Sequence, residues 1–252
     1  MMINAPQYFL DTKLRPPYTS HVKKQHLIKQ RLMKKPRVPE TNDTILGRTH
    51  VEAYDRMQAA LREKGWLETG DLLLNGIVSG LALEAGSGPG YLGLEWLLRT
   101  RDTSLVGLDI SPDMVALAKD HTRELGLTDR ATHILGSAEA IPFEDNALDA
   151  VFTSRSLHEW LNPCSIFTEL WRVLKPGGRL YVSDLRRDLS PTARNFLEKW
   201  VKSEVILASL RASIGAAYTV SEVMALLNMT ELAGCEVTET SLGLCVTGMK
   251  PA

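Results

Sequence analysis

A cluster of glycines that follows an acidic residue is the part of this sequence best suited to hold a ligand. Glu84 precedes a run, residues 86–93, in which every second or third residue is glycine. Glycine lets the backbone turn tightly and approach a ligand closely, so this run predicts a binding loop. A second acidic residue, Asp109, lies about 20 residues further along the chain. These residue types predict a site for a small ligand that carries polar or charged groups.

Two classes of nucleoside cofactor fit this loop. Residues 88–93 follow the dinucleotide pattern G-x-G-x-x-G, and Asp109 stands where that pattern expects an acid. Residues 84–90 instead follow the loop of enzymes whose cofactor carries a sulfonium. Charge favours the sulfonium, because Glu84 would repel a pyrophosphate and Pro89 removes an N–H that should bind phosphate. A nicotinamide-dependent oxidoreductase therefore stays as the less favoured alternative.

A regular alternation of strands and helices must position this loop. Apolar runs predict strands at 81–83, 105–109, 131–135, 150–153 and 179–183. Helical spacing predicts helices at 47–79, 91–98, 114–126, 166–174 and 185–230, with Ser111 and Asp71 as N-caps and a turn at 175–178. Two last runs, 236–240 and 244–249, predict an antiparallel hairpin. The expected fold is α/β: a Rossmann-like, seven-stranded, mostly parallel sheet with helices on both faces and an antiparallel C-terminal hairpin.

Several polar residues fall where the predicted strands end. They are Glu84, Asp109, Ser137, Ser154 and Asp184. Ligands of open parallel sheets bind outside the carboxyl ends of the strands, so these residues predict one shared site.

The composition is that of an ordinary globular protein. The chain has 252 residues, of which 44% are hydrophobic and 23% are charged. Its three cysteines are scattered and show no spacing of metal ligands, so no metal site is expected. Without a signal peptide or an uncharged apolar run, the sequence predicts a cytoplasmic protein with no membrane span.

Charge is distributed unevenly along the chain. Residues 1–40 contain nine Lys/Arg and two acidic residues, which gives this stretch +7 and leaves −8 on the rest. We expect a basic N-terminal arm or lid at 1–46, and a binding domain at 47–252 with a cap-like segment at 185–230. The arm predicts either a lid or a nucleic-acid contact, and the second is not favoured because its helical part, 20–35, has no interleaved aromatic residues.

Five motifs in order resemble the class I S-adenosylmethionine-dependent methyltransferases. The chain is most similar to the group that contains the small-molecule enzymes of ubiquinone and menaquinone biosynthesis. The motifs lie at 84–90, 107–114, 136–143, 156–160 and 169–178. The resemblance covers about residues 49–185 and implies S-adenosylmethionine as cofactor.

The resemblance implies a role for each matching position. The backbone of Gly86, Ser87, Gly88 and Gly90 would hold the methionine part of the cofactor, with Glu84 assisting through water or the loop amides. Asp109 would accept hydrogen bonds from both ribose hydroxyls. Around the adenine, Ile110 and Met114 would lie on its faces and Ser137, Ala138 and Glu139 along its amino edge. Ser154 would line the pocket, and Tyr54 would fold over the cofactor.

The implied activity is transfer of a methyl group to a small-molecule acceptor by in-line displacement, which depends mainly on positioning. His158 is the candidate general base, with a structural histidine as the equal alternative, and Arg155 is a candidate for binding an acidic acceptor, as are Arg186 and Arg187. An alternative is a methyltransferase that acts on RNA or protein recruited by the basic arm. A cofactor-binding module without catalysis is a further alternative.

Overall fold

The computed structural model describes residues 36–40 and 48–252. Most of the predicted basic arm, including its helix at 20–35, lies outside these residues. Residues 37–252 form one compact unit.

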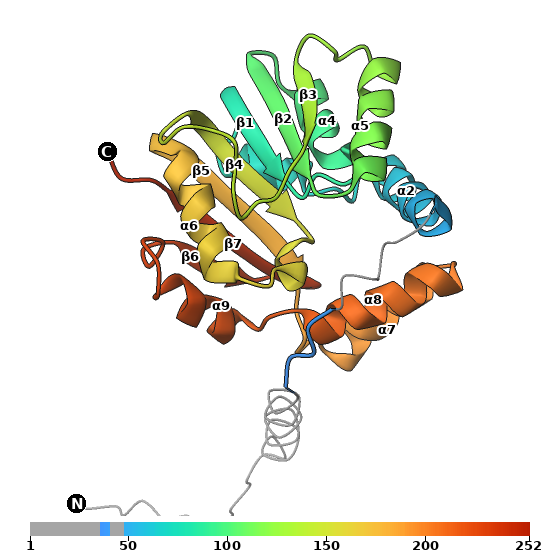
Figure 1. The fold of residues 1–252 in the computed structure, drawn as a ribbon. Helices are drawn as coiled ribbons and strands as arrows, with labels where there is room; N and C mark the ends of the chain where they lie inside the picture. The colour runs from blue at the N-terminus through green and yellow to red at the C-terminus, as the bar shows by residue number, and fades with distance from the viewer. Residues whose placement is uncertain (1–35, 41–47) are drawn as a thin grey trace, which may run out of the picture. The chain divides into compact units, whose positions relative to one another are not determined.

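One seven-stranded sheet runs through this unit in the order β3-β2-β1-β4-β5-β7-β6 (Figure 1). Its strands are β1 (Gly80–Ala85), β2 (Thr103–Asp109), β3 (Ala131–Leu135), β4 (Leu148–Ser154), β5 (Leu174–Leu185), β6 (Glu236–Glu239) and β7 (Gly243–Met249). The first five strands pair in parallel, and β7 pairs antiparallel with both β5 and β6. The predicted fold class is therefore confirmed, including the closing hairpin.

Helices cover both faces of the sheet (Figure 1). They are α2 (Arg48–Glu63), α3 (Thr69–Leu74), α4 (Tyr91–Arg99), α5 (Pro112–Glu124), the 3-10 turn η1 (Leu157–Glu159), α6 (Pro163–Val173), α7 (Pro191–Trp200), α8 (Glu204–Ala216) and α9 (Val220–Leu227). One core cluster joins the sheet to α6 and α9. A second cluster joins the opposite face to α3 and α4, where Trp96 and Phe152 pack edge to face. Burial on both faces explains why the central strands are nearly continuous apolar runs.

The order of the strands fixes where a ligand can bind. The chain runs outward from β1 through β2 to β3, and then returns to the other side of β1 with β4 and β5. Neighbouring loops therefore diverge at the carboxyl ends of β1 and β4, and a crevice opens between them. The glycine loop follows β1, and the segment that contains Arg155 and His158 follows β4.

Most helix starts agree with the sequence, but two local predictions were wrong. Ser111 caps α5 as predicted, since its Oγ accepts from the Met114 N–H at 3.3 Å. Asp71 does not cap a helix at 72–78, because α3 begins earlier, at Thr69, and Asp71 lies in its first turn. The expected turn at 175–178 is instead an irregular start of β5, since the Gly177 N–H donates to the Lys250 carbonyl at the end of β7.

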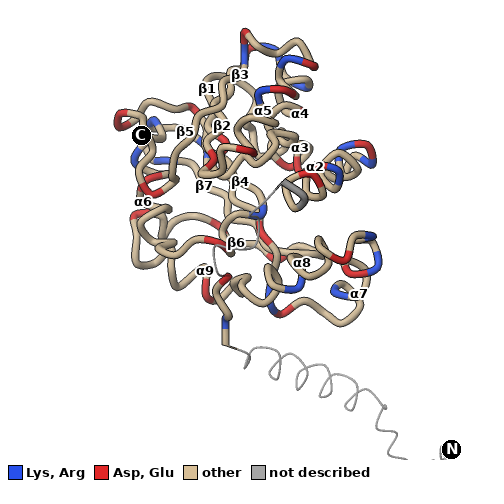
Figure 2. Tube along the Cα trace, turned by 45° about the vertical axis from the view of Figure 1, so that its right-hand side comes forward, with Lys and Arg blue, Asp and Glu red and all other residues tan. Residues whose placement is uncertain are grey.

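Acidic and basic side chains are interspersed over the described residues, as Figure 2 shows along the helices and loops. Many of them form pairs, such as Arg62 with Glu95 and Arg211 with Glu198. Among the helices that the structure describes, none is both long and apolar enough to cross a membrane.

Candidate active site

The glycine loop that follows β1 turns in a way that requires glycine. Gly86, Gly88 and Gly90 have φ angles of +66°, +51° and +83°, a region that other residues rarely adopt. A side chain at Gly86 would also meet Ser156, because an added Cβ would lie 2.6 Å from its Oγ. The loop therefore keeps an open backbone surface beside the segment that follows β4.

The N–H groups of this loop are already used inside the protein. Gly86 and Ser87 donate to the Leu108 carbonyl at 2.8 and 3.1 Å. Gly88 donates to Asp109 Oδ2 at 2.7 Å, and Gly90 donates to the Ser87 carbonyl at 3.0 Å. Pro89 has no N–H. Within residues 86–90, no N–H group is therefore left free to bind a pyrophosphate.

Glu84 occupies the helix N-terminus that a phosphate would otherwise use. Its buried Oε2 accepts from the Gly93 N–H, in the first turn of α4, at 3.2 Å. Burial raises the pKa of Glu84 to about 8, against the lowering effect of the Gly93 hydrogen bond and with a further rise from Asp109. Gly93 allows this approach, because a Cβ there would collide with Oε2. Phosphate-binding loops leave this position free, so the geometry favours the sulfonium reading over the dinucleotide reading.

Asp109 and Tyr54 flank the same loop. Both carboxylate oxygens of Asp109 accept backbone N–H groups, from Gly88 at 2.7 Å and from Ser111 at 2.8 Å, and the side chain remains partly exposed at the end of β2. Tyr54 of α2 lies over Gly88, 3.7 Å from the position of an added Cβ. Its hydroxyl accepts from Gln58 Nε2 at 2.7 Å. Tyr54, which the sequence predicts to fold over the cofactor, therefore lies beside the glycine loop.

The remaining predicted cofactor residues lie around the ends of β1, β2, β3 and β4. Ile110 is 70% exposed, and Met114 is buried at the start of α5. Ser137, Ala138 and Glu139 follow β3, where Ser137 Oγ accepts from the Glu139 N–H at 3.1 Å. Ser154 ends β4 and is half-buried. The Ser87 hydroxyl points into the protein, toward Gly107, so only its backbone faces the loop surface.

A cavity of about 510 Å³ lies beside the ends of β4 and β5. One side is aromatic: the rings of Trp66 and Trp200 are 5.6 Å apart, and those of Trp66 and Phe196 are 6.2 Å apart. Helices α7 and α8, from the predicted cap-like segment, supply much of the apolar lining. Four residues that the sequence placed at the site line the cavity, namely Tyr54, Arg155, His158 and Asp184.

His158 is held by Asp184, which ends β5. The His158 backbone N–H donates to Asp184 Oδ2 at 2.6 Å, and its Nδ1 lies 2.8 Å from Oδ1. Burial lowers the pKa of His158, but Asp184, Glu159 and Glu40 together raise it to about 9. Nδ1 therefore carries a hydrogen toward Asp184, and Nε2 faces the cavity side.

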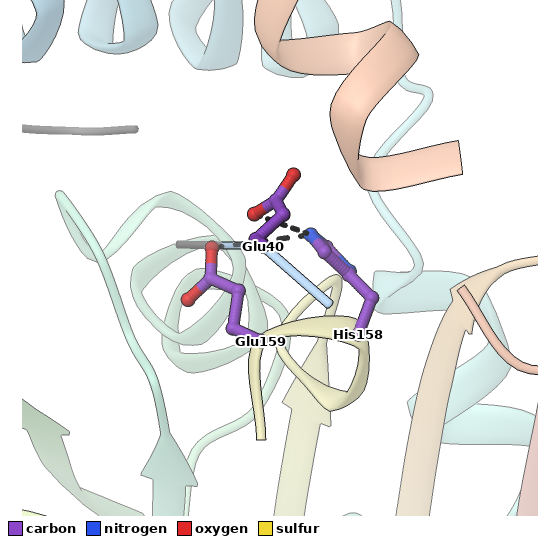
Figure 3. Close-up of side chains that lie close together, drawn as sticks. All are labelled: Glu40, His158 and Glu159. Atoms are coloured by element: carbon purple, nitrogen blue, oxygen red, sulfur yellow. Dashed lines mark ion pairs between the residues drawn. The ribbon is translucent and has the colours of Figure 1, made fainter. Parts of the chain in front are cut away.

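Two acidic residues near His158 were missed by the sequence analysis. Glu40 and Glu159 each place a carboxylate oxygen 3.9 Å from His158 Nε2 (Figure 3). Glu159 could have been noticed, because it follows His158 directly in the last but one motif. Glu40 gave no signal, since it lies far away in the sequence and outside every motif.

The three candidate arginines differ in what they contact. Arg155, with a φ angle of +57°, lines the cavity and pairs with Glu68 at 3.4 Å. Arg186 pairs with Asp188 at 3.3 Å and with Glu239 at 2.7 Å, and Arg187 pairs with Glu222. Of these arginines, only Arg155 is among the cavity-lining residues.

The comparisons with known proteins agree with this geometry. Residues 83–182 match a family described as a methyltransferase domain. The chain is 30% identical to a malonyl-(acyl-carrier protein) O-methyltransferase of Marinomonas sp. over 53% of this chain and 52% of that protein. It is 28% identical to a demethylmenaquinone methyltransferase of Roseiflexus castenholzii over 66% of this chain and 70% of that protein. The plantazolicin methyltransferase BpumL, solved in complex with SAH, has the same fold, with a TM-score of 0.68 at 14% identity over 90% of this chain and 99% of that one.

The sheet order, the glycine loop and the matching domain define a class I methyltransferase fold. Residues 83–182 are therefore a methyltransferase domain of the S-adenosylmethionine-dependent class, and S-adenosylmethionine is the cofactor of that class. The residues present fit that cofactor, because the exposed Gly86 and the partly exposed Gly88 leave backbone surface beside the partly exposed carboxylate of Asp109. The chain spans about half the length of most of the curated relatives it matches.

Proposed function

We propose that the protein transfers the methyl group of S-adenosylmethionine to a small-molecule acceptor bound in the cavity. The observation that carries the proposal is the position of Tyr54, which lies over the glycine loop and also lines the cavity. A cofactor on the loop and an acceptor in the cavity would therefore be neighbours. The cavity volume of about 510 Å³ is typical of small-molecule sites.

The cofactor side of the proposal uses the residues around the glycine loop. We assign the methionine part of the cofactor to the backbone of residues 86–90. Glu84 would support this loop by accepting the Gly93 N–H in the first turn of α4. Asp109 would accept the ribose hydroxyls with the lone pairs that Gly88 and Ser111 leave free. The other assigned residues are Tyr54, Ile110, Met114, Ser137, Ala138, Glu139 and Ser154.

The lining of the cavity suggests what kind of acceptor it takes. Its aromatic wall of Trp66, Phe196 and Trp200 would pack against a flat or apolar body. Its polar end holds Arg155 and His158, so the acceptor would carry a polar group there. A small molecule with one apolar and one polar end fits this distribution.

The bound cofactor supplies a methyl group that its sulfonium has already activated, so the chain mainly has to align the acceptor and exclude water. Asp184 holds the His158 ring in one orientation, and Arg155 is fixed by Glu68. We assign the polar group of the methyl acceptor to this end of the cavity. The carboxylates of Glu40 and Glu159 lie there and could take up a proton that this group releases.

Isothermal titration with S-adenosylmethionine, followed by a transfer assay, tests the proposal. We expect micromolar binding, and label from methyl-labelled cofactor in the small-molecule fraction of a cell extract. Lack of binding by a folded protein would overturn the proposal. Label confined to RNA or protein would also overturn it, in favour of a macromolecular acceptor.

A further inference from the structure

Three potential metal ligands meet at the polar end of the cavity. They are Glu40, His158 and Glu159, whose ligand atoms all lie within 4.8 Å of one another. Figure 3 shows the His158 ring with an ion pair to one carboxylate oxygen of each glutamate. Glu40 comes from the segment before α2, and the other two come from η1. The cluster is thus assembled from two distant parts of the chain.

His158 is oriented as metal-binding histidines usually are. Its Nδ1 lies 2.8 Å from Asp184 Oδ1, in the arrangement that fixes the ring of a metal ligand and leaves Nε2 to coordinate. The side chain is 5% exposed, yet Nε2 is 3.9 Å from the nearest oxygens of Glu40 and Glu159, beyond hydrogen-bond distance. A buried nitrogen therefore faces two carboxylates without a hydrogen bond to either.

Glu40 is also held in place from outside the cluster. Its Oε1 accepts from Ser213 Oγ of α8 at 2.8 Å, which leaves Oε2 facing His158. Arg37 anchors the same segment, since it donates to the His158 carbonyl at 2.7 Å and lies over the Tyr218 ring at 4.3 Å.

We propose that Glu40, His158 and Glu159 bind a divalent first-row metal ion, with Asp184 as the residue that positions His158. One imidazole nitrogen and two carboxylate oxygens suit Mn²⁺, Fe²⁺ or Zn²⁺. With bonds of about 2.0–2.2 Å, the ligand atoms of a tetrahedral ion lie about 3.4 Å apart, so the two 3.9 Å separations would have to close by about half an ångström when the ion binds.

The metal site gives the proposed function a substrate class, and this part rests on that function. Three protein ligands leave coordination positions open toward the cavity. An acceptor with an oxygen donor, such as an enol or a phenol, would occupy one of them. His158 would then be a metal ligand rather than a general base.

Titration of the metal-free full-length protein with Mn²⁺, followed by electron paramagnetic resonance, tests the site, with Zn²⁺ calorimetry as a second probe. We expect one ion per chain, and at least tenfold weaker binding in Glu40→Gln, Glu159→Gln and His158→Gln. Asp184→Asn should weaken binding by about 10–100-fold. Glu204→Gln, in the first turn of α8 and outside the cavity lining, is the matched control and should bind as the unaltered protein does.

Binding of S-adenosylhomocysteine to each variant shows that the variant is folded. If neither metal binds, or if Glu40→Gln and His158→Gln bind as tightly as the unaltered protein, the site is wrong. If S-adenosylhomocysteine then still binds, the proposed function stands and His158 is left as the base. If the metal binds but no cofactor does, the site stands and the proposed function fails.

Discussion

The cofactor edge and the acceptor cavity are built in different ways. The cofactor edge comes from one stretch of chain, β1 with its glycine loop and α4, and from the end of the next strand, β2. The cavity combines parts that are far apart in the chain: Glu40, helix α2, residues 66–71, the segment after β4, the end of β5, helices α7 and α8, and residues 240–244. The edge defined in this way spans residues 80–109, whereas the residues that line the cavity span 40–244.

This difference shows in how polar groups are satisfied. At the cofactor edge, neighbouring backbone groups and two acids bond to each other, as Glu84 does with Gly93. In the cavity, side chains are held by residues far away in sequence, as Glu40 is by Ser213 and His158 by Asp184. We therefore expect substitutions at the cofactor edge to disturb hydrogen bonds to the backbone. Substitutions at the cavity should instead disturb hydrogen bonds between side chains.

The largest expected effect is on stability, from Glu84→Gln. The unfolded carboxyl titrates near its ordinary pKa of 4.5, whereas burial raises the folded pKa to about 8. The folded state thus holds the proton longer, so stability falls as pH rises from about 4.5 to about 8. Gln cannot ionise and can still accept from Gly93. Urea unfolding should show little change at pH 5 and a gain of a few kcal/mol at pH 8.

The exposed Glu63 of α2 is the control for this prediction, and Glu63→Gln should leave the pH profile unchanged. If the stability of Glu84→Gln falls between pH 5 and pH 8 as much as that of the unaltered protein, the buried Glu84 carboxyl is not the cause of the pH dependence.

Gly93→Ala is the next largest expected change. A Cβ at this position would collide with Glu84 Oε2 and lie 2.5 Å from Leu105. Overpacking of this kind costs about 1–3 kcal/mol of unfolding free energy, measurable by urea denaturation. Gly215 in α8 is the matched control, because no atom lies within 4 Å of an added Cβ. Gly215→Ala should be neutral or stabilise by up to about 1 kcal/mol, and equal losses in both variants would refute the packing argument.

Asp109→Ala tests whether the cofactor edge binds the cofactor. We expect at least a tenfold loss of affinity for S-adenosylhomocysteine, about 1.4 kcal/mol, by isothermal titration. Asp102, exposed just before the other end of β2, is the control, and Asp102→Ala should keep the affinity. Unchanged binding by Asp109→Ala would move the ribose site away from β2.

The cofactor edge could be predicted from the sequence because its parts are neighbours in the chain. The glycine loop and the Ser111 cap are each encoded by residues a few positions apart, and Asp109 stands 21 residues after Gly88, the spacing that the motif expects. The direction in which Glu84 points was not predictable, because it depends on α4 packing close enough for Gly93 to donate. The N-cap expected at Asp71 was wrong, because α3 begins at Thr69 and Asp71 lies in its first turn.

The acceptor cavity could be predicted only in part. The sequence indicated His158 and Arg155, since both follow a strand within a motif. It did not indicate that Asp184 would hold the His158 ring or that Glu40 would lie near it. The residues of each contact are far apart in the sequence, and no motif links them. Arg186 and Arg187 show that a position after a strand end does not by itself predict a cavity residue. Both follow the end of β5, yet Arg186 pairs with Glu239 and Arg187 pairs with Glu222.

The smallest expected effect concerns Arg37, which ties the segment before α2 to the cavity. Its guanidinium donates to the Ala216 carbonyl at 2.5 Å and to the His158 carbonyl at 2.7 Å. Arg37→Ala should cost about 1 kcal/mol of unfolding free energy, with affinity for S-adenosylhomocysteine unchanged, because the cofactor edge does not use this segment. Arg99 is the control: it is 47% exposed and pairs only with Glu95 within the described residues, so Arg99→Ala should change stability by less than about 0.5 kcal/mol. A loss of cofactor affinity in Arg37→Ala would mean that the two regions are coupled, and the contrast between a local and an assembled site would fail.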